Sequence, residues 1–150
     1  MPPPPQFINL GSYLMKGSEL SVRQALTQAW TLFAGLTLLD PSIDNLPYAP
    51  QKALSFGLNG QAGTVRIAFD MQHQSELLAL SQSRNAGTIN TQRIDGFSVA
   101  NVRVAYPVPA LGKKGEVFLA MENLFDRSYA YRPGYPMPGR WSQIGLSASL

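Results

Sequence analysis

Hydrophobic and polar residues alternate with a period of two along most of the chain. Five segments show the pattern: 30–38, 54–58, 65–71, 99–106 and 143–150. Successive side chains of a β-strand point to opposite faces, whereas a helix repeats its apolar positions every three or four residues. None of the five segments holds a helical stripe over three turns. The pattern predicts an all-β, antiparallel fold.

Turn-forming residues divide the chain into about seven predicted strands. Their ranges are 6–26, 29–40, 51–60, 63–75, 93–107, 115–125 and 139–150. We expect an irregularity at Gly17 in the first strand, because glycine inside a strand often marks a bulge. Short connections at 25–29, 60–63 and 107–115 alternate with long ones at 41–50, 76–92 and 126–138. Short turns at one end and long loops at the other are typical of a transmembrane β-barrel.

Composition indicates which face of these strands meets lipid. Charged residues are only 14% of the 150, against about 25% in an ordinary soluble domain. A soluble barrel would carry many lysines and glutamates on its outer face, and this chain has few of either. We therefore expect one continuous apolar face toward lipid. On two of the strands it consists of Leu54, Phe56, Leu58, Val65, Ile67, Phe69 and Met71.

Several functional classes are excluded by what the chain contains. It has no cysteine and one histidine, so disulfide scaffolds, thiolate metal sites and a Ser-His-Asp triad are not expected. Asp70, His73 and Glu76 are spaced by three, which on a strand places His73 on the face opposite the two carboxylates. We predict no metal site, no cofactor and no enzymatic activity. The net charge of +3 comes from scattered basic residues, which does not favour nucleic-acid binding.

One segment is specific enough to suggest a family. ENLFDRSY at 122–129 is followed by PGYPMPGR at 133–140 and then by a short alternating strand. This resembles the C-terminal end of TonB-dependent outer-membrane receptors, in which an Asn-Leu-Phe-Asp turn leads through a loop to Pro-Gly-Arg and the last strand. Residues 16–20 (KGSEL) and 46–50 (LPYAP) are similar to two earlier family segments, in the family's order.

The resemblance implies a plugged barrel of about 22 strands in a Gram-negative outer membrane. Such receptors take up ferric siderophores, cobalamin or haem with energy from TonB. The partners it implies are outer-membrane lipid, the remainder of the barrel, the plug domain and the outer-membrane assembly machinery. The chain departs from the family: it shows no plug domain and no TonB-contacting segment. We expect a Pro-rich tail at 1–6 and, at 7–150, the C-terminal portion of an incomplete barrel.

The motif residues are expected to shape the barrel rim. They are Asn123, Leu124, Phe125, Asp126, Pro138, Gly139 and Arg140. Asn and Asp side chains hydrogen-bond nearby backbone in turns, which suits the top of a strand. We expect Leu124 and Phe125 to anchor the corner in apolar surroundings. Arg140 could pair with a carboxylate such as Glu122 or Asp126.

Two further groups of residues are candidates for contacts outside the chain. At the long loops, arginines could attract an anionic ligand and tyrosines could stack on it. These candidates are Arg84, Asn85, Asn90, Arg93, Tyr131, Arg132 and Tyr135. The last strand resembles the C-terminal signal read by the assembly machinery, through Gln143, Gly145, Ala148 and Leu150. Leu150 stands where the family usually has Phe.

Two other functions stay open from the sequence. A small membrane β-protein could close a pore by self-association, as a porin-like channel. A soluble, lipocalin-like binding module would turn its apolar face inward instead. Extraction behaviour distinguishes the last case, since a soluble module needs no detergent.

Overall fold

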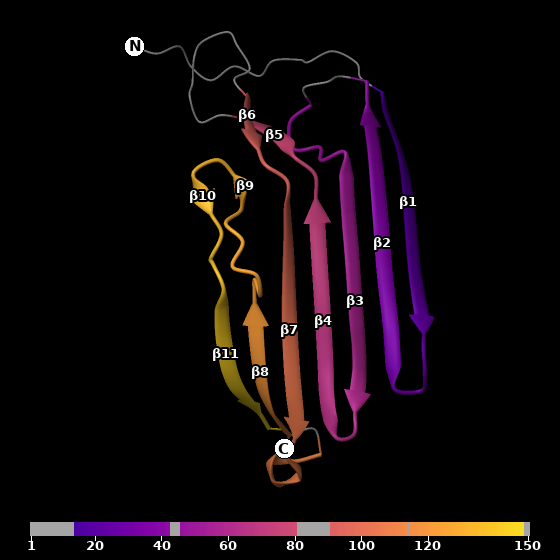
Figure 1. Ribbon diagram of the computed structural model, residues 1–150, viewed down its shortest axis with the longest axis vertical. Helices are drawn as coiled ribbons and strands as arrows, with labels where there is room; N and C mark the ends of the chain where they lie inside the picture. The colour runs from indigo at the N-terminus through magenta and orange to yellow at the C-terminus, as the bar shows by residue number, and fades with distance from the viewer. Residues whose placement is uncertain (1–13, 43–45, 81–90, 114, 149–150) are drawn as a thin grey trace.

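Seven long strands form one antiparallel sheet in the computed structural model, which describes residues 14–42, 46–80, 91–113 and 115–148 (Figure 1). Their order is β1-β2-β3-β4-β7-β8-β11, so strands adjacent in the sheet follow one another along the chain. The bounds are Met15–Ala25 (β1), Trp30–Pro41 (β2), Lys52–Ala62 (β3), Val65–Gln74 (β4), Phe97–Pro107 (β7), Glu116–Glu122 (β8) and Trp141–Ser147 (β11). The predicted all-β meander is confirmed.

Two small hairpins extend the long connections and were not predicted. One pairs β5 (Leu77–Leu80) with β6 (Thr91–Ile94), and the other pairs β9 (Ala130–Arg132) with β10 (Tyr135–Pro136). Strands of two to four residues are too short to show a period-two pattern. The predicted strand 93–107 is in fact divided between β6 and β7 at Asp95 and Gly96.

The expected irregularity at Gly17 is wrong. The register between β1 and β2 runs without a shift from Met15 opposite Pro41 to Ala25 opposite Thr31. Gly17 keeps its backbone pairing with Leu39, so the ladder stays regular at this glycine. The predicted tail 1–6 and the N-terminal part of the first predicted strand lie outside the described residues.

The three short connections lie at one end of the sheet and the three long ones at the other, in agreement with the sequence (Figure 1). We call these the short-turn end and the long-loop end. Between β3 and β4 the turn is two residues, with Gly63 at a φ of +61°. A 3₁₀ turn, Pro109–Leu111, lies between β7 and β8. No helix among the described residues is long and apolar enough to cross a bilayer.

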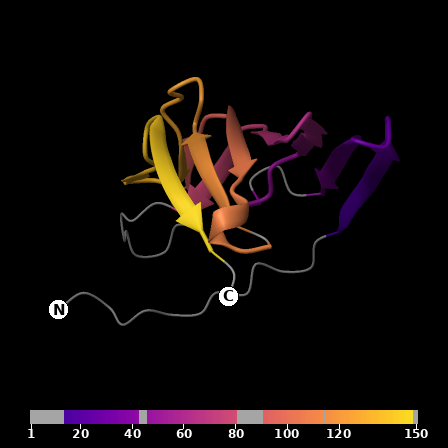
Figure 2. The ribbon, with the colours of Figure 1, turned by 90° about the horizontal axis from the view of Figure 1, so that it is seen from below.

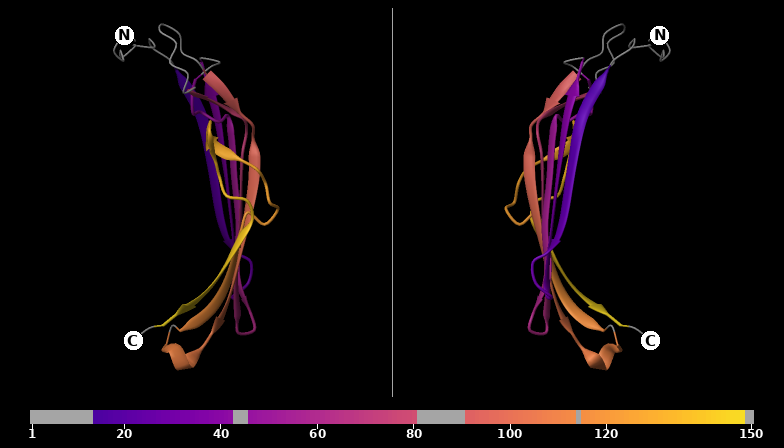
Figure 3. Two further views of the ribbon diagram at one scale, coloured as in Figure 1. Left: turned by 90° about the vertical axis from the view of Figure 1, so that its left-hand side faces the viewer. Right: turned by 90° about the vertical axis from the view of Figure 1, so that its right-hand side faces the viewer.

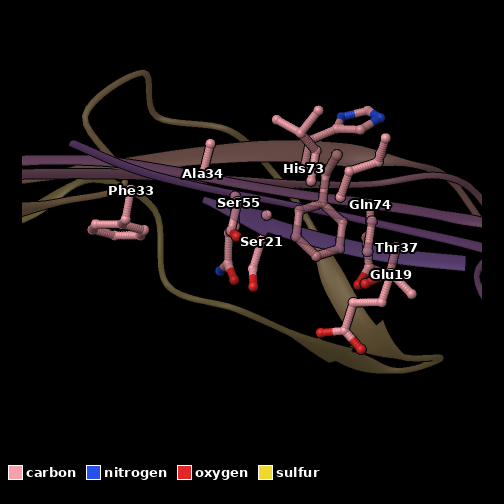
Figure 4. A pocket seen from close by; sticks show the side chains of 14 residues that line it. Glu19, Ser21, Phe33, Ala34, Thr37, Ser55, His73 and Gln74 are labelled. Carbon is pink, nitrogen blue, oxygen red and sulfur yellow. The ribbon is translucent and has the colours of Figure 1, made fainter. Parts of the chain in front are cut away.

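Cross-strand register brings the predicted apolar segments together on one face. In one row, successive partners across five strands are Leu32, Leu58, Phe69, Val102 and Met121. The neighbouring row on the other face includes Gly57, Asp70 and Asn101. Figure 4 shows the alternation directly, with Ala34 and His73 on one side of the sheet and Glu19, Ser21 and Ser55 on the other. These are called the apolar face and the polar face below.

The sheet is curved and open (Figures 2 and 3). Edge strands β1 and β11 each have one partner in the sheet. On the apolar face, Ile144 is 77% exposed and Leu146 is 71% exposed. No large side chain is fully buried among the described residues. A lipocalin-like core therefore does not form in the described chain.

Aromatic rings cover three glycines on two pairs of neighbouring strands, β2 with β3 and β8 with β11. Phe33 lies over Gly57 and Phe118 lies over Gly145, each directly opposite in the register. A Cβ added to Gly57 would come within 2.0 Å of the Phe33 ring, and one on Gly145 within 2.3 Å of Phe118. Trp30 covers Gly60 in the same way. These positions need glycine because a ring occupies the space of a side chain.

Candidate functional site

The apolar face ends sharply toward the long-loop end. On six strands its last apolar residue is Leu38, Leu54, Met71, Ala100, Met121 or Ile144. On five of these strands the next residue on the same face is polar: Asp40, Lys52, His73, Ser98 or Ser142. Each of these five strands thus changes from apolar to polar within one step of its two-residue repeat.

This boundary runs diagonally across the sheet. Followed through the register, Ile144 of β11 stands level with Trp30 of β2, eight residues from Leu38. Eight residues are about 26 Å along a strand, and the five intervening strand spacings are about 24 Å. A boundary parallel to a membrane surface therefore requires the strands to tilt by about 45°. Transmembrane strands tilt by about that amount.

On the polar face, charged side chains bond to one another across strands. Near the short-turn end Glu116 receives hydrogen bonds from both Arg66 and Arg103. The Arg103 guanidinium also lies 4.3 Å from the centre of the Phe118 ring. Farther along the face, the side-chain amide of Asn101 donates to Asp70 at 2.8 Å. A polar face whose side chains are joined by hydrogen bonds and ion pairs suits contact with water.

The corner after β8 is organised by the side chain of Asn123, which is 3% exposed. Its amide nitrogen donates to the carbonyl oxygens of Arg127, at 2.8 Å, and Pro138, at 3.1 Å. Its amide oxygen accepts from the backbone nitrogen of Arg127 at 2.8 Å. Asn123 has a φ of +50°, a conformation that asparagine tolerates better than most residues. One side chain therefore connects both strands of the loop.

Asp126 and Gly139 form the second part of the corner. The Asp126 carboxylate accepts a hydrogen bond from the backbone nitrogen of Arg140 at 2.8 Å. A Cβ on Gly139 would lie 2.7 Å from that carboxylate oxygen, so any side chain there would disturb the bond. The Asn-Leu-Phe-Asp and Pro-Gly-Arg segments are thus joined by hydrogen bonds from the side chains of Asn123 and Asp126 to backbone groups of Pro138 and Arg140.

Two expectations for this corner need correction. Phe125 is 70% exposed, so it is not anchored in apolar surroundings within the described chain. Leu124 is half-buried, and its backbone nitrogen donates to Ala100. The Arg140 side chain takes part in none of the ion pairs of the described residues, which involve Arg66, Arg93 and Arg103. Only its backbone meets Asp126.

The loop after the corner packs over the polar face through aromatic rings. Phe97 of β7 lies with its ring centre 4.6 Å from Tyr129 and 5.2 Å from Tyr131. Gln72 of β4 donates to the Tyr131 hydroxyl at 3.1 Å. Burial, together with nearby Tyr131 and Glu122, raises the pKa of Tyr129 above its usual value. Sequence reasoning missed this cluster, because Phe97 and Tyr129 become neighbours only through the sheet order.

Open grooves lie along the sheet. One of about 360 Å³ is lined mainly by polar-face residues of β1 to β4, among them Glu19, Ser21, Ser55 and Gln72 (Figure 4). The three residues considered for a metal site each have a different partner. Asp70 is hydrogen-bonded to Asn101, His73 lies against the Ser98 hydroxyl, and Glu76 forms an ion pair with Arg93. No metal-binding group of three acidic or histidine side chains occurs in the part of the chain that the structure describes.

A scan against protein-family models and a search of curated proteins gave no match. Solved structures do match. The ferric-catecholate import receptor Fiu from E. coli K12, in its open form, is 22% identical with a TM-score of 0.68, over 89% of this chain and 20% of its own. The chain has the fold of part of a TonB-dependent receptor barrel.

Two further structures agree. The copper transporter OprC has a TM-score of 0.65 at 22% identity, over 88% of this chain and 22% of its own. The FrpB iron transporter from Neisseria meningitidis has a TM-score of 0.66 at 19% identity, over 89% of this chain and 23% of its own. The chain thus spans about a fifth of the length of these receptors. All three neighbours are named as import or transport proteins.

In this receptor fold the predicted loop candidates fall into separate groups. Tyr131, Arg132 and Tyr135 share the β9–β10 hairpin, and Tyr135 is 62% exposed. Arg93 lies on β6, where Glu76 holds it in an ion pair. Arg84, Asn85 and Asn90 lie outside the described residues. Among the described candidates, the hairpin therefore brings three together, and ligand contact there stays a prediction.

The residues proposed for assembly also divide. Gln143 lies on the polar face opposite Ala120, and Gly145 lies beneath Phe118. Ala148 follows the end of β11, and Leu150 is outside the described residues. Gly145 thus has a packing reason of its own, which the spacing of the signal did not reveal.

Replacing Asn123 by alanine should lower the free energy of unfolding by about 2–3 kcal/mol, because buried groups lose three hydrogen bonds. Urea unfolding of the chain folded in detergent micelles measures the change. Asn59→Ala, at an exposed site on the polar face of β3, is the matched control and should change stability little. Equal effects of both variants would show that the corner is not a stabilising element.

Proposed function

We propose that this chain forms part of the wall of an outer-membrane transporter. Its apolar face lies against lipid and its polar face lines the interior of a larger barrel. The diagonal apolar boundary is the observation that carries the proposal, because a soluble sheet has no reason to end its apolar face along one line on six strands. The similarity in fold to receptor barrels supports the same conclusion.

The transported substrate is proposed to be a scarce metal nutrient carried in a complex, of the ferric siderophore, cobalamin or haem type. Two of the structural neighbours are described as iron or ferric-catecholate proteins and one as a copper transporter. In the whole barrel, transport would depend on TonB and on a plug domain, and insertion into the membrane would depend on the assembly machinery. The exposed hairpin residues Arg132 and Tyr135 are the proposed ligand contacts of this segment.

Single-cysteine labelling tests the position of the wall, and the chain has no cysteine of its own to interfere. Leu54→Cys lies on the apolar face and Ser55→Cys, one residue away, lies on the polar face. With a bimane on each, nitroxide lipids in vesicles should quench residue 54 strongly and residue 55 weakly. Equal quenching at both positions would refute the lipid-facing wall.

Whole-cell uptake tests the transport activity. Cells that make a complete barrel containing these strands should accumulate radiolabelled ferric chelate, and removal of TonB should abolish that accumulation. A porin-like channel works by diffusion, so its uptake would persist without TonB. Persistent uptake would therefore reject the proposed TonB-dependent transport and favour the porin-like function.

A further inference from the structure

Within the described strands, ionisable residues on the apolar face occur only toward the long-loop end. Among the described strands, the acidic and basic side chains on that face are Lys16, Asp40, Lys52 and His73. Lys16 and Asp40 are direct cross-strand partners of opposite charge. Lys52 and His73 occur in none of the ion pairs of the described residues. Two neighbouring strands thus present basic groups immediately beyond the apolar boundary.

Lys52 and His73 lie beside two hydroxyl groups, those of Ser75 and Ser98. His73 stands opposite Leu54, two residues from Lys52, and its Nδ1 lies 2.9 Å from the Ser98 hydroxyl oxygen. The Nε2 atom of His73 takes no part in that contact. The Ser75 hydroxyl accepts a hydrogen bond from the Lys52 backbone nitrogen at 3.1 Å. Toward the short-turn end from them, Leu54 and Phe56 begin the apolar part of β3.

A cavity of about 700 Å³ opens beside this cluster. Its lining includes Lys52, His73, Ser75 and Arg93, with Leu46 and Leu77 as apolar walls. Glu76 is the acidic residue in the lining, and Arg93 already pairs with it. The remaining charge of the cavity is therefore basic.

We propose that this basic pocket binds the phosphate group of a membrane lipid. The inference rests on the proposed function, because it requires the apolar face to meet acyl chains. A lipid phosphate lies directly beyond its acyl chains, as Lys52 and His73 lie directly beyond Leu54 and Met71. Continuity of the apolar surface with the basic cluster selects a lipid over a free phosphate ion, which would gain nothing from the leucines.

Site-specific quenching measures the preference. The chain carrying bimane at Leu54→Cys is folded in phosphatidylcholine vesicles that contain a small fraction of nitroxide-labelled phosphatidic acid. The comparison uses the same fraction of nitroxide-labelled phosphatidylcholine. Basic residues near a membrane surface each favour an anionic lipid about fivefold, so we expect phosphatidic acid to be enriched at residue 54 by at least that factor.

The double variant Lys52→Gln, His73→Gln should reduce this enrichment to about one. Lys113→Gln removes one positive charge at the short-turn end and is the control that should leave it unchanged. Millimolar inorganic phosphate should not abolish the enrichment. Its abolition by inorganic phosphate, or its survival in the double variant, would overturn the lipid site. No quenching of residue 54 by either lipid would instead refute the proposed membrane wall.

Discussion

Phe56→Arg is expected to destabilise the membrane-inserted chain by about 2–4 kcal/mol, the cost of a basic residue near the middle of a bilayer. Phe56 lies at the centre of the apolar part of β3, between Leu54 and Leu58. Its ring also packs edge-on against Phe69, with ring centres 6.3 Å apart, and this contact would be lost as well. Urea titration of the chain folded in vesicles, followed by tryptophan fluorescence, gives the free energy.

Ser55→Arg is the matched control for this variant. It introduces the same side chain one residue away, on the polar face, where water can solvate the guanidinium. We expect its effect to stay below about 1 kcal/mol, as for an ordinary surface substitution. If the apolar face instead met water, the order would reverse, because Phe56→Arg would then improve solubility at little cost. The sign of the difference between the two variants decides which face meets lipid.

Much of the sheet could be predicted because each long strand carries its own pattern. Val65 to Met71 alternates without reference to any other segment, and the register then aligned those residues with the alternating residues of β3 and β7. Strand ends were less certain. β7 begins at Phe97, directly after Gly96, where an added Cβ would come within 2.9 Å of the Gln74 carbonyl oxygen, and local alternation does not encode such a contact between distant residues.

The candidate site was harder to predict, because it depends on contacts between loops. Turn chemistry pointed to Asn123 and Asp126, but not to the partners that each would bind. The Phe97 and Tyr129 contact and the Glu116 ion pairs join residues that the sheet order brings together. Phe125 was expected to be anchored and is exposed, because a turn motif fixes its backbone and not the direction of every side chain.

The chain on its own is expected to self-associate through the free edge of β1, and to give no stable monomer in plain buffer. β1 is an eleven-residue strand with one partner, and all of its residues are exposed. Unpaired backbone groups along such an edge are a template for pairing with another chain, and in lipid each costs several kcal/mol. Analytical ultracentrifugation with and without detergent measures the effect. A monodisperse monomer that melts cooperatively in plain buffer would contradict it.

The direction of the strands determines which edges can meet. Adjacent strands of the seven-stranded sheet are antiparallel, so β1 and β11 run the same way (Figure 1). A head-to-tail ring of copies would therefore need a parallel seam at every junction, whereas bacterial barrels have even numbers of antiparallel strands. Two copies of β1 related by a twofold axis would pair antiparallel.

Ser21→Cys, near the middle of β1, should therefore form cross-links between copies with a short bismaleimide, and Ser55→Cys on the interior strand β3 should not. Cross-links between Ser21→Cys in one copy and Gln143→Cys in another, in preference to the symmetric product, would instead support a porin-like ring.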